Sequence, residues 1–293
     1  MQPPVTPPRS ILTLANDDST MTTGAHDHPL LACTGICKRF GPVRALEDVD
    51  FDVYAGEVVA LVGDNGAGKS TLVKAIAGIQ PADHGSYLFE GRPVEIKSPA
   101  DATRLGIETV YQDLALCDNL DTVANLFLGR ELVGPARVLS LLRVLAEPDM
   151  EKLAATQLRD LGVTTLKSVR TPVATLSGGQ RQAVAVARPT LWNVKLLILD
   201  EPTAALGITQ TAQVLELIEH LRAQGLGIVV ISHNIDVVFE VADRIVVLYV
   251  GRRVATFERR RTTREQVIGA IVGLPPDERP AEGTAAELVG ANR

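Results

Sequence analysis

A glycine-rich turn that ends in Lys69, Ser70 and Thr71 directly follows the apolar run Val58–Val62. Glycines allow positive φ and a close approach to an anion, so that successive N–H groups can point at phosphate oxygens. The lysine adds a mobile cation and the serine a hydroxyl suited to magnesium. The apolar run predicts a strand buried on both faces, and a helix is predicted after the turn. We therefore expect nucleotide phosphates at Gly63, Asp64, Asn65, Gly66, Ala67, Gly68, Lys69, Ser70 and Thr71.

Two adjacent carboxylates, Asp200 and Glu201, follow a second apolar run, residues 196–199. In open α/β sheets ligands bind at the carboxyl ends of the strands, where paired carboxylates can hold and use magnesium. His233 follows a third apolar run, residues 226–231, and reaches the same edge. A lone histidine is usually structural, but this position beside other site elements favours a functional role.

A second anion-binding helix end is predicted at the segment Leu-Ser-Gly-Gly-Gln, residues 176–180. Ser177 can cap the helix, and the amides of its first turn then stay open to an anion. The residues concerned are Ser177, Gly178, Gly179 and Gln180. One chain therefore carries two phosphate-binding helix ends.

Composition narrows the class of protein. The chain has 293 residues, 46% of them hydrophobic, which indicates a soluble globular enzyme with one large α/β domain. No apolar run approaches the roughly 18 residues of a membrane-spanning helix, so any membrane span is expected in another chain. A net charge of -6 argues against nucleic acid as a partner.

The three cysteines, Cys33, Cys37 and Cys117, are interpreted as reduced thiols. Cys33 and Cys37 could hold a metal, but both fall in a predicted strand. Residues 1–29 are rich in proline and polar side chains and are predicted to be a disordered arm, as is the tail 274–293.

The chain between these ends divides into three parts. Residues from 31 onward predict an antiparallel β subdomain, in which Val49 to Val53 alternates apolar and acidic side chains and Glu90-Gly91-Arg92 forms a hairpin turn. A strand over 107–111 ends at Gln112. Residues 113–175 predict an inserted helical lobe, with Asp121 and Asp149 each capping a helix. The alternative is that this segment is an ordinary part of the core.

Taken together, residues 63–70, Gln112, residues 176–180, residues 196–201 and His233 resemble the Walker A, Q-loop, signature, Walker B and switch-histidine motifs of ABC-transporter ATPases. The match spans about residues 31–273, and the pentapeptide at 176–180 is close to diagnostic of that family. The resemblance implies an α/β fold of the P-loop NTPase class. Its mostly parallel sheet core, within residues 30–273, would carry the antiparallel β subdomain and the helical lobe.

The resemblance also implies roles for single residues. Phe40, which taken alone reads as a core residue, would stack on adenine. The loop with Lys69 would hold the phosphates of ATP. Mg²⁺ would lie among Ser70, Gln112 and Asp200. The catalytic residues would be Glu201, which polarises the attacking water, His233, which touches the γ-phosphate, and Gln112.

In this family the signature of one subunit closes over ATP held by the other, so the resemblance implies a homodimer or a pairing with a related subunit. The dimer would dock on two transmembrane permease subunits at the cytoplasmic face of the membrane. Residues 201–207 and 64–68 look like those of bacterial monosaccharide importers of the fructose, ribose or xylose type. A periplasmic-type sugar-binding protein would then be an indirect partner.

Two residues depart from the family pattern, and two other functions stay open. Most members carry Asp where Gly207 stands, so the usual contact between subunits through that loop is in doubt. Pro189 stands where relatives continue a helix, and we expect that helix to kink or stop near Arg188. The other functions are the ATPase of an exporter and a non-transport ABC protein that acts on ribosomes or DNA.

Overall fold

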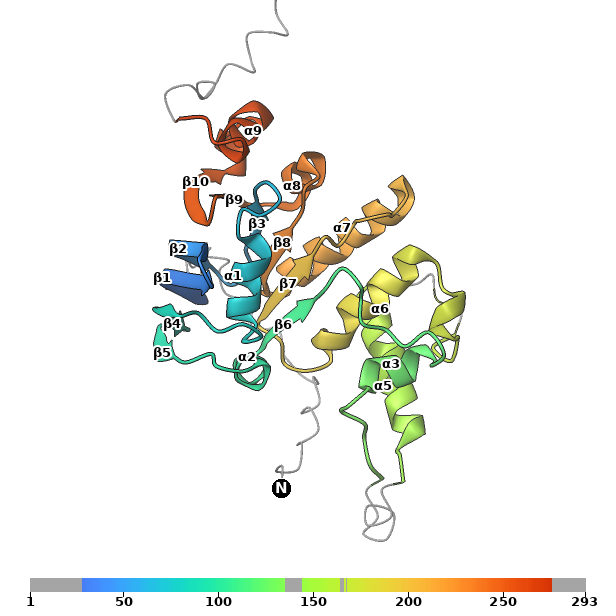
Figure 1. The fold of residues 1–293 in the computed structure, drawn as a ribbon. Helices are drawn as coiled ribbons and strands as arrows, with labels where there is room; N and C mark the ends of the chain where they lie inside the picture. The colour runs from blue at the N-terminus through green and yellow to red at the C-terminus, as the bar shows by residue number, and fades with distance from the viewer. Residues whose placement is uncertain (1–27, 135–143, 164–165, 167, 276–293) are drawn as a thin grey trace, which may run out of the picture.

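The computed structural model describes residues 28–134, 144–163, 166 and 168–275. Its centre is a six-stranded sheet in the order β10-β9-β3-β8-β7-β6 (Figure 1). Every neighbouring pair is parallel except β9 and β10, which confirms the mostly parallel core. The strands are β3 Val58–Val62, β6 Ile107–Val110, β7 Leu196–Asp200, β8 Gly227–Ile231, β9 Arg244–Tyr249 and β10 Arg252–Glu258.

A four-stranded antiparallel sheet in the order β2-β1-β4-β5 lies beside the central sheet (Figure 1). Its strands are β1 Leu31–Phe40, β2 Val43–Val53, β4 His84–Phe89 and β5 Arg92–Val94. The predicted alternation in β2 is confirmed, because Val49, Phe51 and Val53 are buried and the acidic residues between them are not. Glu90 and Gly91 both have positive φ, as a two-residue hairpin turn requires.

Helices cover both faces of the central sheet (Figure 1). α1 Lys69–Ile76 packs into the core shared with the antiparallel sheet, and α7 Ile208–Ala223 packs on the opposite side. The sequence analysis did not predict α2 Pro99–Leu105, α8 Ile235–Val241 and α9 Arg264–Ile271. These helices have only 7, 7 and 8 residues, too few for an apolar period to stand out.

The helical lobe contains α3 Thr122–Phe127 and α5 Glu147–Asp160, which pack with α6 Gly178–Thr190 (Figure 1). Asp121 caps α3, since its carboxylate accepts a hydrogen bond of 2.7 Å from Ala124 N, as predicted. The prediction that Asp149 caps α5 is wrong. The cap position is Ala146, three residues earlier, because Pro148 occupies the first turn, where the fixed φ of proline suits a helix.

The predicted domain bounds, 30–273 with a lobe over 113–175, remain a prediction. Most of the predicted arm and of the predicted tail lies outside the described residues. Cys33 and Cys37 both lie in β1 as predicted, and they and Cys117 are free thiols.

Pro189 lies buried in the last turn of α6, which ends at Thr190. The helix therefore stops near Arg188, as predicted. Trp192 N donates to Pro189 O at 2.9 Å, so the chain turns away directly behind the proline. The carbonyl of Ala185, one turn earlier, cannot receive a hydrogen bond from position 189, because proline has no N–H.

We expect Pro189→Ala to raise the melting temperature. Proline in a helix interior costs ~3 kcal/mol, which exceeds the roughly 1.6 kcal/mol from losing two buried methylenes. Pro99→Ala is the matched control, because Pro99 stands at the start of α2, where proline is favoured. A clearly lower melting temperature for Pro189→Ala would contradict the expectation.

Candidate functional site

The register of the parallel strands brings the predicted site segments to one edge of the sheet. Ile231 of β8 pairs with Leu61 of β3 and also with Asp200 of β7. Val110 of β6 pairs with Leu199 of β7. The phosphate loop begins directly after β3, and Asp200 is the last residue of β7, with Glu201 directly after it. Gln112 and His233 each lie two residues after the end of their strand, β6 and β8.

The phosphate loop has no room for side chains at two of its glycines. Gly63 has φ 150°, and a Cβ there would lie 2.3 Å from Leu248 O at the end of β9. Gly68 has φ 104°, and a Cβ there would lie 2.8 Å from Ala45 O in β2. Both contacts are with backbone, which cannot move aside as a flexible side chain can. The loop is therefore held between the two sheets.

Gly251 braces this loop, a role that the sequence analysis missed. Its N–H donates to Ala67 O at 3.0 Å, and its carbonyl accepts from Glu47 N at 2.8 Å. Its φ is 74°, and a Cβ would lie 2.9 Å from Ala45 O. The sequence analysis placed Gly251 between two strands, but only the fold brings that turn to the phosphate loop.

Lys69 lies over the loop that it terminates. Its Nζ donates to Gly63 O at 2.7 Å and to Asp64 O at 2.9 Å. Partial burial lowers the pKa of Lys69, and the nearby carboxylates of Glu201, Asp64 and Asp200 oppose that effect. As the first residue of α1, Lys69 also places its N–H among the helix amides that have no acceptor one turn earlier. A cation and open amides at a helix N-terminus form a site for phosphate.

Glu201 and His233 are joined directly. His233 Nδ1 lies 2.8 Å from Glu201 Oε1, and His233 N donates to the same oxygen at 3.1 Å. Glu201 has φ 52°, a left-handed conformation that is uncommon for glutamate. Its own N–H donates to Ile231 O at 2.9 Å, which holds the strained residue against β8. The Glu201 carboxylate is thus fixed at the sheet edge.

Asp200, the residue before, is half-buried at the end of β7. Burial raises the pKa of its carboxyl group, and the neighbouring charge of Glu201 raises it further. A carboxyl group whose pKa is shifted by burial and by a neighbouring charge is typical of a functional site.

Two predicted residues lie at the surface. Phe40, the last residue of β1, is 43% exposed, so the interpretation as a core residue is wrong. The ring is pushed out because Phe40 ends its strand beyond the region where β1 packs on the core. Gln112 is also exposed, two residues after the end of β6.

The second helix end is built as predicted. Gln180 N donates to Ser177 Oγ at 3.3 Å, and Gln180 Oε1 accepts from Ser177 N at 3.0 Å, so the two side chains form a capping box. A Cβ on Gly179 would lie 3.1 Å from Gln210 Cβ in α7, which explains a glycine there.

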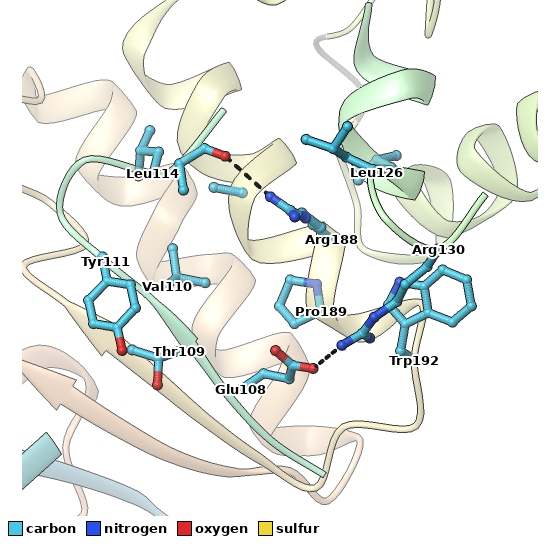
Figure 2. Close-up of a pocket in the computed structure, with 13 residues that line it drawn as sticks. Glu108, Thr109, Val110, Tyr111, Leu114, Leu126, Arg130, Arg188, Pro189 and Trp192 are labelled. Atoms are coloured by element: carbon cyan, nitrogen blue, oxygen red, sulfur yellow. Dashed lines mark hydrogen bonds and ion pairs between the residues drawn. The ribbon is translucent and has the colours of Figure 1, made fainter. Parts of the chain in front are cut away.

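A groove of about 240 Å³ lies between β6 and the lobe, and its lining includes Tyr111, the residue before Gln112 (Figure 2). Glu108 and Arg130 form an ion pair of 2.7 Å across it, and Arg130 also stacks over Trp192. Its walls come from both the core and the lobe and are formed by Glu108, Thr109, Val110, Tyr111, Leu114, Ala115, Leu126, Leu128, Arg130, Ala185, Arg188, Pro189 and Trp192.

A phosphate loop between a buried strand and a helix, with a carboxylate at the end of another parallel strand of the same sheet, defines a nucleotide-binding protein of the P-loop class. The family model described as ABC transporter matches residues 46–204. The fructose import ATP-binding protein FrcA of Rhizobium meliloti is 46% identical over 88% of this chain and 98% of its own length. The chain belongs to the ATP-binding family of ABC transporters, and it binds and hydrolyses ATP.

Other proteins agree with this assignment. The xylose/arabinose import ATP-binding protein XylG of Sulfolobus acidocaldarius is 44% identical over 81% of this chain and 92% of its own length. The ribose import ATP-binding protein RbsA of Caldanaerobacter subterraneus is 38% identical, and the chain spans about half of it, 48%. The ADP conformation of MJ1267, an ATP-binding cassette of an ABC transporter, superposes with TM-score 0.68 and 27% identity over 84% of this chain and 96% of its own.

We expect Lys69→Ala to abolish ATP hydrolysis and to leave the fold intact. The change removes the cation aimed at the phosphates, and losing one such group typically costs about 10²- to 10³-fold in turnover. Lys69→Met is the matched variant, because it keeps the aliphatic stem. Steady-state ATP hydrolysis and thermal melting test this together. Wild-type turnover in Lys69→Met would contradict the role of the charge.

We expect Asp200→Asn to stabilise the nucleotide-free protein at pH 8 more than at pH 5. The raised pKa of Asp200 means that its ionisation costs folding free energy. This cost is absent below the ordinary pKa of ~3.9 and grows as the pH rises through the folded-state value. A gain of about 2 °C in melting temperature is expected at pH 8. An equal gain at both pH values, or the same gain for the exposed Asp160→Asn, would refute this account.

Proposed function

We propose that this protein is the ATP-hydrolysing subunit of a membrane importer for a monosaccharide. One observation supports the proposal: the core carries a glycine-rich loop that Lys69 closes, and a separate helix end capped by Ser177 lies on the lobe. Relatives named for fructose and xylose/arabinose import favour a sugar. The names also favour import over the ATPase of an exporter, and over action on ribosomes or DNA.

ATP would bind with its phosphates on the loop and its adenine on Phe40. The exposed ring at the end of β1 fits a stacking role, because 43% of its surface is free. The open amides in the first turn of α1, from Lys69 to Thr71, and the Lys69 cation would hold the phosphates.

The residues present fit Mg²⁺, which takes oxygen ligands from one or two carboxylates together with substrate phosphates. Asp200 offers a carboxylate whose raised pKa makes a nearby cation favourable. Ser70 in the first turn of α1 and Gln112 after β6 would supply the neutral oxygens. Bound there, the ion would neutralise charge on the phosphates.

Glu201 is the best-placed group to take a proton from the attacking water. Its carboxylate is mostly buried, with 15% of the side chain exposed, and His233 holds one of its oxygens. His233, 77% exposed, would then be free to reach toward the γ-phosphate side while its Nδ1 orients the carboxylate. General base catalysis of this kind contributes about 10²- to 10⁴-fold.

The helix end at Ser177, Gly178 and Gly179 would serve ATP held by a second copy of the chain. A cassette 23% identical to this chain is known as a dimer bound to ADP and Pi. In this chain Gly207 starts α7 and donates its N–H to Gln210 Oε1 at 3.2 Å. Glycine cannot supply the side-chain contact expected of aspartate, so the loop would meet its partner through backbone alone.

The permease would dock in the groove beside Gln112. Among the described residues, no helix is both long and apolar enough to cross a bilayer. The groove is lined by residues of the core and of the lobe, and Tyr111 in its lining is the residue before Gln112, so a partner seated there would touch both parts (Figure 2). The protein would thus sit at the cytoplasmic face of the membrane, and a sugar-binding protein would act through the permease.

We expect Glu201→Gln to trap an ATP-bound dimer. The amide keeps the shape of the carboxylate but cannot accept a proton, so hydrolysis stops while MgATP still binds. Closure over the γ-phosphate by the partner's signature residues would then persist. Size-exclusion chromatography of the mutant with and without MgATP measures the dimer.

Two results would count against this mechanism. Wild-type ATP turnover in Glu201→Gln would exclude this residue as the general base. An inactive Glu201→Gln protein that never dimerises, even with its permease present, would exclude the two-chain site. Lys69→Met combined with Glu201→Gln is the control, because it should stay monomeric for lack of bound phosphate.

A further inference from the structure

The loop between Gln112 and α3 is bound to the helix that carries the second anion site. Asp118 Oδ1 lies 2.7 Å from Arg181 Nη2, and Asp118 O accepts from Ala174 N at 3.1 Å. Arg181 is one turn into α6, and its own N–H donates to Ser177 O at 2.9 Å. The ion pair therefore joins residues 63 positions apart, from 118 to 181, beside the capped helix end.

Two further contacts fix the same loop. Asn125 is fully buried, and its side chain accepts from Cys117 N at 2.7 Å and donates to Cys117 O at 3.0 Å. Arg188 Nη1 donates to Ala115 O at 3.2 Å, across the groove wall (Figure 2). From Ala115 onward the loop is thus part of the lobe.

The junction with the core is short and strained. Leu114 and Ala115 have φ of 59° and 47°, two consecutive left-handed residues that are not glycine. Such conformations are unfavourable for side chains with a Cβ and persist only where the surroundings determine them. Only residues 111–114 separate β6 from the clamped loop. Few residues could therefore absorb a displacement of Gln112 before the displacement reached α6.

We propose that Asp118 and Arg181 are positioning residues that couple Gln112, on the magnesium side of this chain's own nucleotide, to the Ser177 helix end that faces the partner's nucleotide. The inference rests on the proposed function, since it needs a two-chain site. The pair cannot be explained by stability: both side chains are partly exposed, 31% for Arg181 and 59% for Asp118, and such ion pairs stabilise a fold by only ~0–1 kcal/mol. The Asp118–Arg181 pair instead fixes the loop that follows Gln112 at one position on α6.

The test uses the full chain in the Glu201→Gln background, where the dimer is expected to persist. Three variants are made in this background. They are Arg181→Gln, Asp118→Asn, and the double substitution Asp118→Arg with Arg181→Asp, which exchanges the two charges. Two quantities are measured: the dissociation constant of the MgATP-bound dimer by analytical ultracentrifugation, and the affinity of the monomer for a fluorescent ATP analogue.

Each single substitution is expected to weaken the dimer about tenfold, a size typical of coupling between sites. The monomer should keep its nucleotide affinity within about twofold, because the phosphate loop is untouched. The charge exchange should recover most of the lost dimer affinity, which a merely structural defect would not do. The matched control is Lys195→Gln, which breaks the Lys195–Glu90 pair, also 2.7 Å and partly exposed, at the start of β7. It should change neither quantity.

The outcomes separate the two ideas. If Glu201→Gln dimerises and both single substitutions dimerise equally well, the coupling is refuted and the two-chain site stands. If the charge exchange is no better than the single substitutions, the ion pair is not the element that couples the sites. If Glu201→Gln fails to dimerise with its permease present, the two-chain site is refuted, and the coupling with it.

Discussion

The structure depends on the narrow space around the phosphate loop. The carbonyls of Leu248 and Ala45 lie so close to Gly63 and Gly68 that no Cβ fits at either glycine. Because β9 supplies one of these carbonyls and β2 the other, the loop is shaped by both sheets at once. Gly251 also links the two, because it is hydrogen-bonded to Ala67 in the phosphate loop and to Glu47 in β2. The way the antiparallel sheet packs on the core therefore also determines the shape of the phosphate loop.

The charges at this edge are arranged for an anionic ligand even though most of the side chains are acidic. Asp64, Asp200 and Glu201 surround Lys69, and their charges oppose the fall in its pKa that burial causes. Attraction for phosphate then comes from Lys69 and from the amides at the start of α1. Glu201 has a left-handed backbone and contacts His233, whereas Asp200 ends its strand half-buried, so the two adjacent carboxylates have different surroundings.

The lobe is tied together by contacts between residues far apart in the chain. Arg170 pairs with Asp121, Glu147 and Glu151, which joins the segment before the signature to the starts of α3 and α5. Single exposed pairs contribute little, but a network with one shared arginine restricts how these starts can move. The capped end at Ser177 thus receives its position from three separate stretches of sequence.

The sequence alone determined the central strands, the phosphate loop, the capping role of Ser177 and the carboxylates after β7. Each depends on local chemistry: buried parallel strands are apolar throughout, and tight turns and caps need particular residues. It did not determine the start of α5, where Pro148 in the first turn outweighed Asp149, or the helices α2, α8 and α9, which are too short to show a period. Only the tertiary structure decided that Phe40 is exposed, that Gly251 braces the loop, that Glu201 contacts His233 and that Asp118 meets Arg181. These facts join residues from different elements, and no local pattern specifies which elements the fold brings together.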